Sequence, residues 1–291
     1  MDPVRIGCVK YLNTLPLIEG LAKWQDAGGC ELVAAAPSRL IGMLLAGEVD
    51  VALASVIDAV QPVVLLPVGM IGSDGPTLTV RVFSRVPIEQ VRRVTVDSES
   101  HTSVALLQVL MQRRFGVRIE CIPSTPRHLD TSTPSDALLL IGDKVVTDAP
   151  PAHDFPHQLD LGAAWKELTG LPFVYAVWMC RAGEEDSLKV RAAAAMLDRA
   201  RRHNAMRMDW LVASHAESRG WQPQPAAEYL GSLLKYDVGE PERAAVDKFL
   251  GWAAGLGLCG NAAPRWSGPV RAAAEPARGR ADVRTTLSAP A

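Results

Sequence analysis

The amino-acid sequence predicts an α/β protein built from two lobes, with a helical last third. Three features of the 291 residues predict this fold class. Strand-like and helix-like segments alternate over residues 4–54, which is the βαβ pattern of a parallel sheet. A second alternation of the same kind begins near residue 84. From about residue 184 onward the pattern becomes helical and rich in charged residues.

The first unit contains three short apolar or alternating segments that are typical of strands. These predicted strands are residues 4–9, 31–36 and 51–54. Helices are predicted between them, over residues 17–24 and 37–46. Asn13 or Thr14 can cap the first helix, and Pro16 suits its first turn. Residues 63–66 are apolar, and residues 77–83 alternate as a further strand does.

The second unit repeats this arrangement without repeating the sequence. Its predicted strands are residues 94–96, 117–122 and 137–141. A polar turn follows the first of them, and a helix is predicted from Val104 to Phe115. Gly116 ends that helix, as glycine commonly does.

The last third contains three predicted helices and a tail. The helices are expected over residues 184–219, 225–236 and 240–256. From residue 263 the composition shifts to Ala, Pro, Arg and Gly, with five arginines against Glu275 and Asp282. Such a composition predicts a disordered segment.

Charge and motif content exclude several classes of function. Thirty Lys and Arg against 32 Asp and Glu give a formal charge of −2, so no overall basic field predicts a nucleic-acid partner. No apolar run approaches the roughly 20 residues of a membrane span, and residues 1–20 do not form a secretion signal. These features predict a cytoplasmic protein with no membrane partner. The cysteines and histidines show no metal-ligand spacing and no phosphate loop is present, so we expect neither a metal nor a cofactor.

Small polar groups at or near strand ends, and at the start of one helix, form the candidate site. They are Asn13, Ser55, Thr79, Ser100, Thr102, Ser103, Gly142 and Asp143. Ligands of open α/β sheets bind beyond the carboxyl ends of strands, and helix N-termini favour carboxylates. Each position also has an ordinary explanation, because Ser, Thr and Asp often only cap helices. Their concentration in both units predicts a small anion held between the lobes.

Five segments resemble the chorismate dehydratases of the futalosine route to menaquinone. They are residues 9–17 with Y-L-N-x-x-P-L, 47–53 with G-E-x-D, 97–103 with D-x-x-S-x-T-S, 140–143 with I-G-D, and 160–174 with D-L-G-x-x-W-x-x-x-T-G-L-P-F. Residues Tyr229, Leu230, Tyr236 and Phe249 fit the helical end, so the resemblance covers about residues 4–260. Lys10 and Lys144 stand where this family more often has small residues.

The resemblance implies a fold like the type II periplasmic binding proteins, with the helical C-terminal segment packed on the first lobe. It implies a first lobe of residues 1–83 plus 178–262, a second lobe of residues 84–177, and a tail of residues 263–291. The chain would cross between lobes near residues 83–85 and 174–178.

The implied activity is that of a hydro-lyase with no cofactor. Chorismate would lose a ring hydrogen and the neighbouring hydroxyl, giving 3-[(1-carboxyvinyl)oxy]benzoate and water. Because the product is aromatic, the enzyme mainly has to position the substrate and direct a proton transfer. The substrate's own enolpyruvyl carboxylate is one candidate for the proton acceptor.

The resemblance also implies roles for the candidate residues. Asn13 would bind the departing hydroxyl or the ether side of the ring, and Thr79 would hydrogen-bond the departing water. Thr79 stands where this family often has serine, so the hydroxyl is kept. The remaining residues would bind the substrate or shape its site: Ser55, Ser100, Thr102, Ser103, Gly142 and Asp143.

Two alternative functions share the expected fold. The sister enzyme 1,4-dihydroxy-6-naphthoate synthase has a histidine in an I-H-E segment, where this chain has Ile141, Gly142 and Asp143. A protein that binds a small acid without reacting with it is the second alternative, because a fold does not fix a function. The oligomeric state is left open, with a homodimer as one option.

Overall fold

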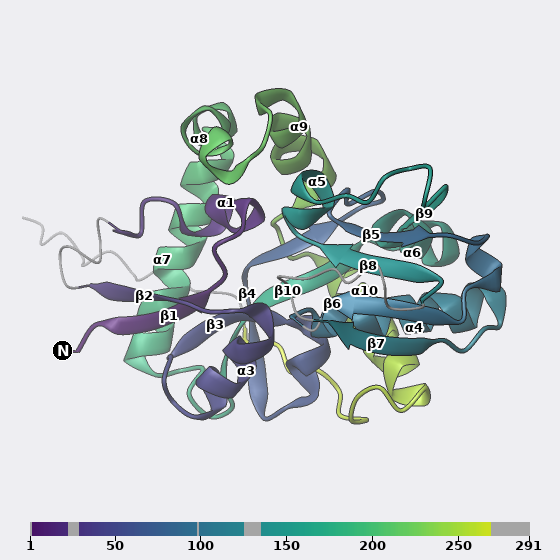
Figure 1. Cartoon of the computed structure of the whole chain (residues 1–291). Coiled ribbons are helices and arrows are strands. Elements are labelled where there is room, and N and C mark those ends of the chain that lie inside the picture. Colours follow the sequence, from purple (N-terminus) through teal and green to yellow (C-terminus); the bar gives the residue numbers. More distant parts are fainter. Residues whose placement is uncertain (1, 23–28, 98, 125–134, 269–291) are drawn as a thin grey trace, which may run out of the picture.

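Two β-sheets lie side by side and carry helices on their outer faces (Figure 1). The structure is a computed structural model that describes residues 2–22, 29–97, 99–124 and 135–268. The predicted tail from residue 269 onward and part of the predicted loop over 123–134 lie outside these residues.

The first sheet has six strands in the order β11-β4-β10-β3-β1-β2. They are β1 (Val4–Cys8), β2 (Cys30–Ala34), β3 (Val51–Ser55), β4 (Val63–Ser73), β10 (Phe173–Arg181) and β11 (Leu234–Lys235). Strand β1 pairs in parallel with β2 and β3, which confirms the predicted βαβ pattern. Strand β10 lies antiparallel between β3 and β4, although it comes from much later in the chain.

The second sheet has five strands in the order β7-β6-β8-β5-β9. They are β5 (Val80–Ser84), β6 (Arg93–Asp97), β7 (Glu120–Ser124), β8 (Ala137–Ile141) and β9 (His157–Asp160). Strand β8 is buried throughout, which explains its uninterrupted apolar sequence. Strand β9 was not expected from its sequence, because a four-residue polar segment carries too little alternation to indicate a strand.

Nine helices are described on these sheets. They are α1 (Leu15–Ile18), α3 (Pro37–Leu45), α4 (His101–Phe115), α5 (Lys144–Thr147), α6 (Leu161–Thr169), α7 (Leu188–Ala205), α8 (Met208–His215), α9 (Pro223–Glu228) and α10 (Glu240–Gly255). The long helix expected over 184–219 is broken into α7, α8 and a 3-10 turn, η4 (Glu217–Arg219). The helix expected over 225–236 ends early in a π turn, η5 (Tyr229–Leu233), because the next residues pair with β4 as strand β11.

The chain changes sheets twice, at the same end of the cleft. Strand β4 belongs to the first sheet, and after residues 74–79 the chain enters β5 in the second sheet. It returns before Phe173, the first residue of β10. Residues 80–83 lie in β5 of the second sheet and therefore belong to the second lobe. All of β10 lies in the first sheet and therefore belongs to the first lobe. We propose that the lobes meet at residues 74–79 and 170–172.

A cluster of aromatic side chains joins the two lobes behind the cleft. Helix α10 packs against β10 of the first sheet and α4 of the second lobe. Its Phe249 lies edge-on to Trp165 of α6 and to Phe173 of β10, at ring-centroid distances of 6.1 and 5.0 Å. All three rings are buried. Helix α7 instead packs on β4 and β1, so the helical C-terminal segment covers the first lobe and reaches the second.

Residues 263–268, where the sequence predicts a disordered tail to begin, are described and partly pair with the first sheet. Leu65 N donates to Arg265 O at 2.8 Å, and Ser267 N donates to Leu65 O at 2.9 Å. Residues 265–267 therefore lie along β4. Among the described residues, no helix combines the length and the apolar character needed to cross a bilayer.

Asp50 of the G-E-x-D segment joins β1 to the start of β3. Arg5 N donates to its Oδ2 at 2.8 Å and Arg5 Nη2 to its Oδ1 at 3.0 Å. Asp50 is 5% exposed, so its charge depends on this partner. Burial acts to raise the pKa of Asp50, but the hydrogen bonds from Arg5 outweigh it and hold the pKa below the usual value. The segment therefore has a structural role.

Replacing Asp50 with alanine is expected to lower the free energy of unfolding by about 2–3 kcal/mol. The loss stays below the roughly 3–5 kcal/mol of a fully buried pair because the side chain of Arg5 is 35% exposed. A lowered pKa stabilises the fold above the unfolded-state pKa, and the benefit disappears as the pH falls through the folded-state value. Urea unfolding at pH 7 and at pH 3 measures both effects. The exposed neighbour Glu48→Ala is the control, and an equal loss in both variants would contradict the prediction.

Candidate functional site

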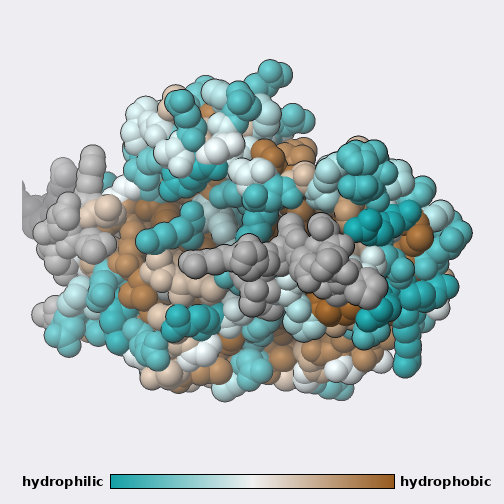
Figure 2. Space-filling model, viewed as in Figure 1, coloured by the Kyte–Doolittle hydropathy of each residue, from teal (hydrophilic) through white to brown (hydrophobic). Residues whose placement is uncertain are grey.

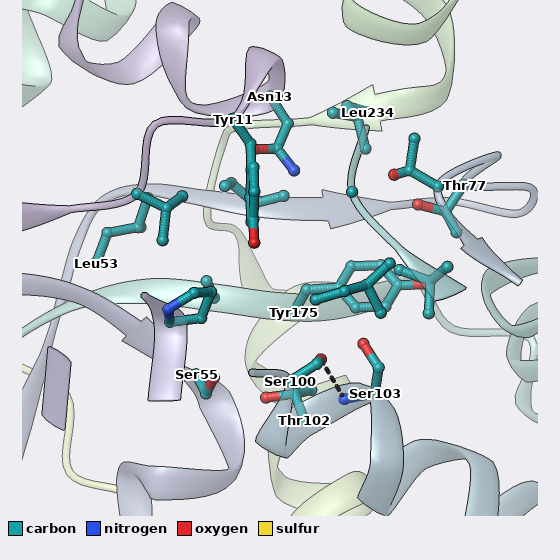
Figure 3. A pocket seen from close by; sticks show the side chains of 18 of the residues that line it. Tyr11, Asn13, Leu53, Ser55, Thr77, Ser100, Thr102, Ser103, Tyr175 and Leu234 are labelled. Atoms are coloured by element: carbon teal, nitrogen blue, oxygen red, sulfur yellow. Dashed lines mark hydrogen bonds between the residues drawn. The ribbon is translucent and has the colours of Figure 1, made fainter. Parts of the chain in front are cut away.

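A cleft between the lobes collects most of the candidate residues. The cavity within it has a volume of about 80 Å³, below the roughly 300–1,000 Å³ of small-molecule sites, so the lobes lie close together around it. The candidate residues that line it are Asn13, Ser55, Thr79, Ser100, Thr102, Ser103 and Gly142. Asp143 is the one candidate residue that does not line the cleft. Figure 3 shows Tyr11 and Asn13 on one side of the cleft, Ser100, Thr102 and Ser103 on the other, and Tyr175 between them.

Asn13 lies in a short 3-10 turn, η1 (Leu12–Thr14), that directly follows β1. Leu12 and Thr14 are buried on either side of it, so the turn is fixed by packing. The Thr14 hydroxyl donates to Asn13 Oδ1 at 3.2 Å. The Nδ2 group of Asn13 carries two further hydrogens, which can be donated to a ligand or to another side chain.

The opposite wall is the N-terminus of α4. The Ser100 hydroxyl accepts a hydrogen bond from Ser103 N at 3.3 Å, so Ser100 caps this helix. Thr102 Oγ1 accepts from Ile57 N at 3.4 Å, which ties α4 to the first lobe and leaves the threonine proton free to donate. The first N–H groups of a helix have no partner inside it and attract anions. This wall can hold a carboxylate with neutral donors alone.

Thr79 is presented by a strained turn that joins the two sheets. Thr79 N donates to Thr77 O at 2.8 Å, and Leu78 between them has a φ of +66°. Of the described residues other than glycine, only Leu78 has a positive φ. Such a γ-turn is rare and costs about 1–3 kcal/mol.

Asp160 holds this turn in place. Its carboxylate accepts hydrogen bonds from Thr77 N at 3.0 Å and from Leu78 N at 2.8 Å. The same carboxylate caps α6 by accepting from Ala163 N. Asp160 begins the D-L-G segment, which therefore supports the position of Thr79 from a distance of about 80 residues in sequence. Nothing in the local sequence of Asp160 indicates that role.

Gly142 and Asp143 follow β8 at the end of the cleft. Gly142 has a φ of +64° and donates from its N–H to Thr79 O at 2.8 Å. The ring of Tyr11 lies 3.6 Å from the position a Cβ would take, so a side chain here would be strained and close to that ring. Asp143 points away from the cleft, and its Oδ1 accepts from Trp221 Nε1 at 2.9 Å. Burial raises the pKa of Asp143 despite this bond.

Two buried tyrosines also line the cleft and were not among the candidates. The hydroxyl of Tyr229 lies 2.6 Å from Thr79 Oγ1, and the side chain of Asn13 lies close enough to hydrogen-bond the same hydroxyl. Tyr175 lies on β10, where burial and the Asp160 carboxylate raise its pKa. An aromatic residue in a helix or strand usually signals core packing, so only the distant contacts reveal these hydroxyls.

The groups that line the cleft are electrically neutral. Among its described lining residues there is no Asp, Glu, Lys, Arg or His. Lys144 is engaged next to it, because its Nζ donates to Asp97 Oδ2 at 2.6 Å. Lys10 is exposed and does not line the cleft. The described residues also hold no group of three or more side chains suited to a metal ion.

Comparison with solved structures identifies the fold. The crystal structure of the periplasmic aliphatic sulphonate binding protein of Escherichia coli superposes with a TM-score of 0.64, at 16% identity, over 99% of each chain. A likeness at that identity concerns the fold alone, and it confirms the predicted two-lobed architecture of the periplasmic-binding-protein type.

Comparison of sequences identifies the family. A chorismate dehydratase of Thermus thermophilus is 30% identical over 276 residues, which cover 89% of this chain and 97% of that protein. A chorismate dehydratase of Campylobacter jejuni is 25% identical over 249 residues, covering 84% of this chain and 95% of that one. A family model described as menaquinone biosynthesis matches residues 4–255. The chain therefore belongs to this menaquinone biosynthesis family.

Proposed function

We propose that this protein is a chorismate dehydratase, a hydro-lyase that converts chorismate to 3-[(1-carboxyvinyl)oxy]benzoate and water. The observation that carries the proposal is the cleft between the lobes, where Asn13 lies opposite the N-terminus of α4 and Thr79 is a second neutral donor in the lining. The Thermus relative, 97% of which is covered by this chain, supports the same activity.

The proposed reaction makes few chemical demands, and the cleft matches them. A ring C–H bond and the neighbouring C–O bond break, a third double bond forms between the two ring carbons and makes the ring aromatic, and the proton and hydroxide leave as water. Aromatisation supplies the driving force, so the protein has to orient the substrate and stabilise the departing oxygen. Asn13 and Thr79 supply neutral donors for that oxygen.

The proton acceptor is proposed to be the substrate itself. The described lining residues offer no carboxylate, imidazole or amine that could take the ring proton. The enolpyruvyl group is attached through its ether oxygen to the ring carbon that loses its hydrogen, so its carboxylate can reach that proton. Ser103 and Thr102, with the first N–H groups of α4, would hold a carboxylate of the substrate.

Other parts of the proposal rest on the sequence alone. A cytoplasmic location and a homodimer remain predictions. Position 142 lines the cleft and is a glycine in this chain, whereas the pattern of the sister 1,4-dihydroxy-6-naphthoate synthase has a histidine there. This difference favours the dehydratase activity over the synthase activity.

Incubating the purified protein with chorismate tests the proposal. We expect the absorbance of the cyclohexadiene to fall while an equal amount of the carboxyvinyloxy-benzoate appears by liquid chromatography. The same assay without protein gives the background rate. Tight binding of chorismate without turnover would instead support a non-catalytic binding protein of this fold.

A further inference from the structure

We infer that Tyr229 is a positioning residue for the proposed dehydration, because its hydroxyl sets the direction in which Thr79 offers its hydrogen. The inference rests on the proposed function and names a residue that acts through Thr79. Tyr229 is 1% exposed and belongs to the π turn η5, far from both partners in sequence.

The hydrogen-bond capacities of the three groups define a directed chain. Asn13 Oδ1 accepts from Thr14, and the Nδ2 group of Asn13 can donate to the Tyr229 oxygen. The phenol then has its own proton to donate, and Thr79 Oγ1 lies 2.6 Å away to accept it. Thr79 consequently keeps its hydroxyl proton for the cleft. The order Asn13, Tyr229, Thr79 thus ends on a donor that faces the ligand.

Tyr229 is held rigidly enough for this task. Its ring stacks on Trp221 with 4.9 Å between ring centroids and 8° between the planes. The indole N–H of Trp221 donates to Asp143 of the second lobe, so the stack is anchored across the cleft. Burial raises the pKa of Tyr229, which keeps the phenol protonated. A phenol that stays protonated can orient its neighbours through hydrogen bonds. It is a poor general acid, because it does not readily release its proton.

The chain contains a matched control for the loss of this hydroxyl. Tyr236 is also buried, at 9% exposure, and its hydroxyl has no hydrogen-bond partner among the described residues. Tyr229→Phe and Tyr236→Phe therefore remove the same atom from two buried rings of one segment. Only the first removal breaks a contact with the proposed site.

Steady-state kinetics with chorismate test the inference. Tyr229→Phe is expected to lower kcat about tenfold, the effect of one neutral hydrogen bond, with KM changed less than about twofold. Tyr236→Phe is expected to keep kcat within about twofold. Equal kcat values for the two variants would overturn the inference.

A double-mutant cycle separates positioning from a structural effect. If Tyr229 acts through the Thr79 hydroxyl, adding Tyr229→Phe to Thr79→Val should change kcat by less than about twofold. Independent, multiplicative losses would show that Tyr229 only supports the fold and would overturn the inference. If the wild-type protein does not turn over chorismate, the proposed function and this inference both fail. If the wild-type protein is active and Tyr229→Phe is equally active, only the inference fails.

Discussion

Replacing Asn13 with alanine is expected to lower kcat for chorismate by about 100- to 1,000-fold. That is the usual cost of removing one fixed donor from a site where charge develops on oxygen. The buried neighbours of Asn13 fix the η1 turn, so the substitution removes the donor without moving the backbone. Kinetics at saturating chorismate measure the effect.

Two comparisons make this result interpretable. Lys10→Ala changes an exposed residue of the same segment that does not line the cleft, so we expect turnover close to that of the unaltered protein. The thermal unfolding midpoint of Asn13→Ala should stay near the unaltered value, because Asn13 is only half-buried. Turnover by Asn13→Ala within about fivefold of the unaltered protein would remove Asn13 from the reaction.

Replacing Ser103 with alanine is expected to raise KM for chorismate by about tenfold or more while kcat changes little. A hydroxyl that binds a carboxylate makes a charge-assisted hydrogen bond, which contributes about 1.5–3 kcal/mol. We expect α4 to bind the carboxylate that does not accept the proton, so the charge and the binding of this group are the same before and during the chemical step. Initial rates over a range of chorismate concentrations separate the two constants.

Ser100→Ala is the matched control at the same helix. The cap uses Ser103 N and Ser100 Oγ, so Ser103→Ala leaves it intact and Ser100→Ala removes it. Loss of a cap typically costs about 1 kcal/mol of stability. We therefore expect a lower unfolding midpoint for Ser100→Ala and an unchanged midpoint for Ser103→Ala. A Ser103→Ala variant with normal KM would show that the carboxylate binds elsewhere.

The sequence predicts those site residues whose place in the fold follows from the strand or helix next to them in the chain. Ser55 ends a strand, Gly142 directly follows one, Asn13 lies in the turn after one, and Ser100 caps a helix, so sequence alone placed them at one edge of each sheet. The carboxyl ends of strands in both lobes meet at the cleft, which brings these groups together. Asp143 also follows a strand, but its carboxylate turns toward Trp221, because local sequence does not specify which way a side chain points.

The sequence predicts those helices and strands whose hydrophobic pattern lies within one continuous segment of the chain. The parallel order of β1, β2 and β3 follows from short connections that favour right-handed crossovers. Strand β11 and the break after α9 were not predictable, because pairing with β4 overrides a helical pattern there. Propensity is a weak influence compared with a strand pairing that completes a sheet.

The sequence by itself determined the α/β class, the two units and the neutral donors that follow their strands, because those features depend on residues close together in the chain. Only the tertiary structure decided that Asp160 supports the strained turn at Leu78, and that Tyr229 meets Thr79 across 150 positions. Contacts of that range arise from the packing of whole elements, and their partners carry no shared local pattern that could indicate them.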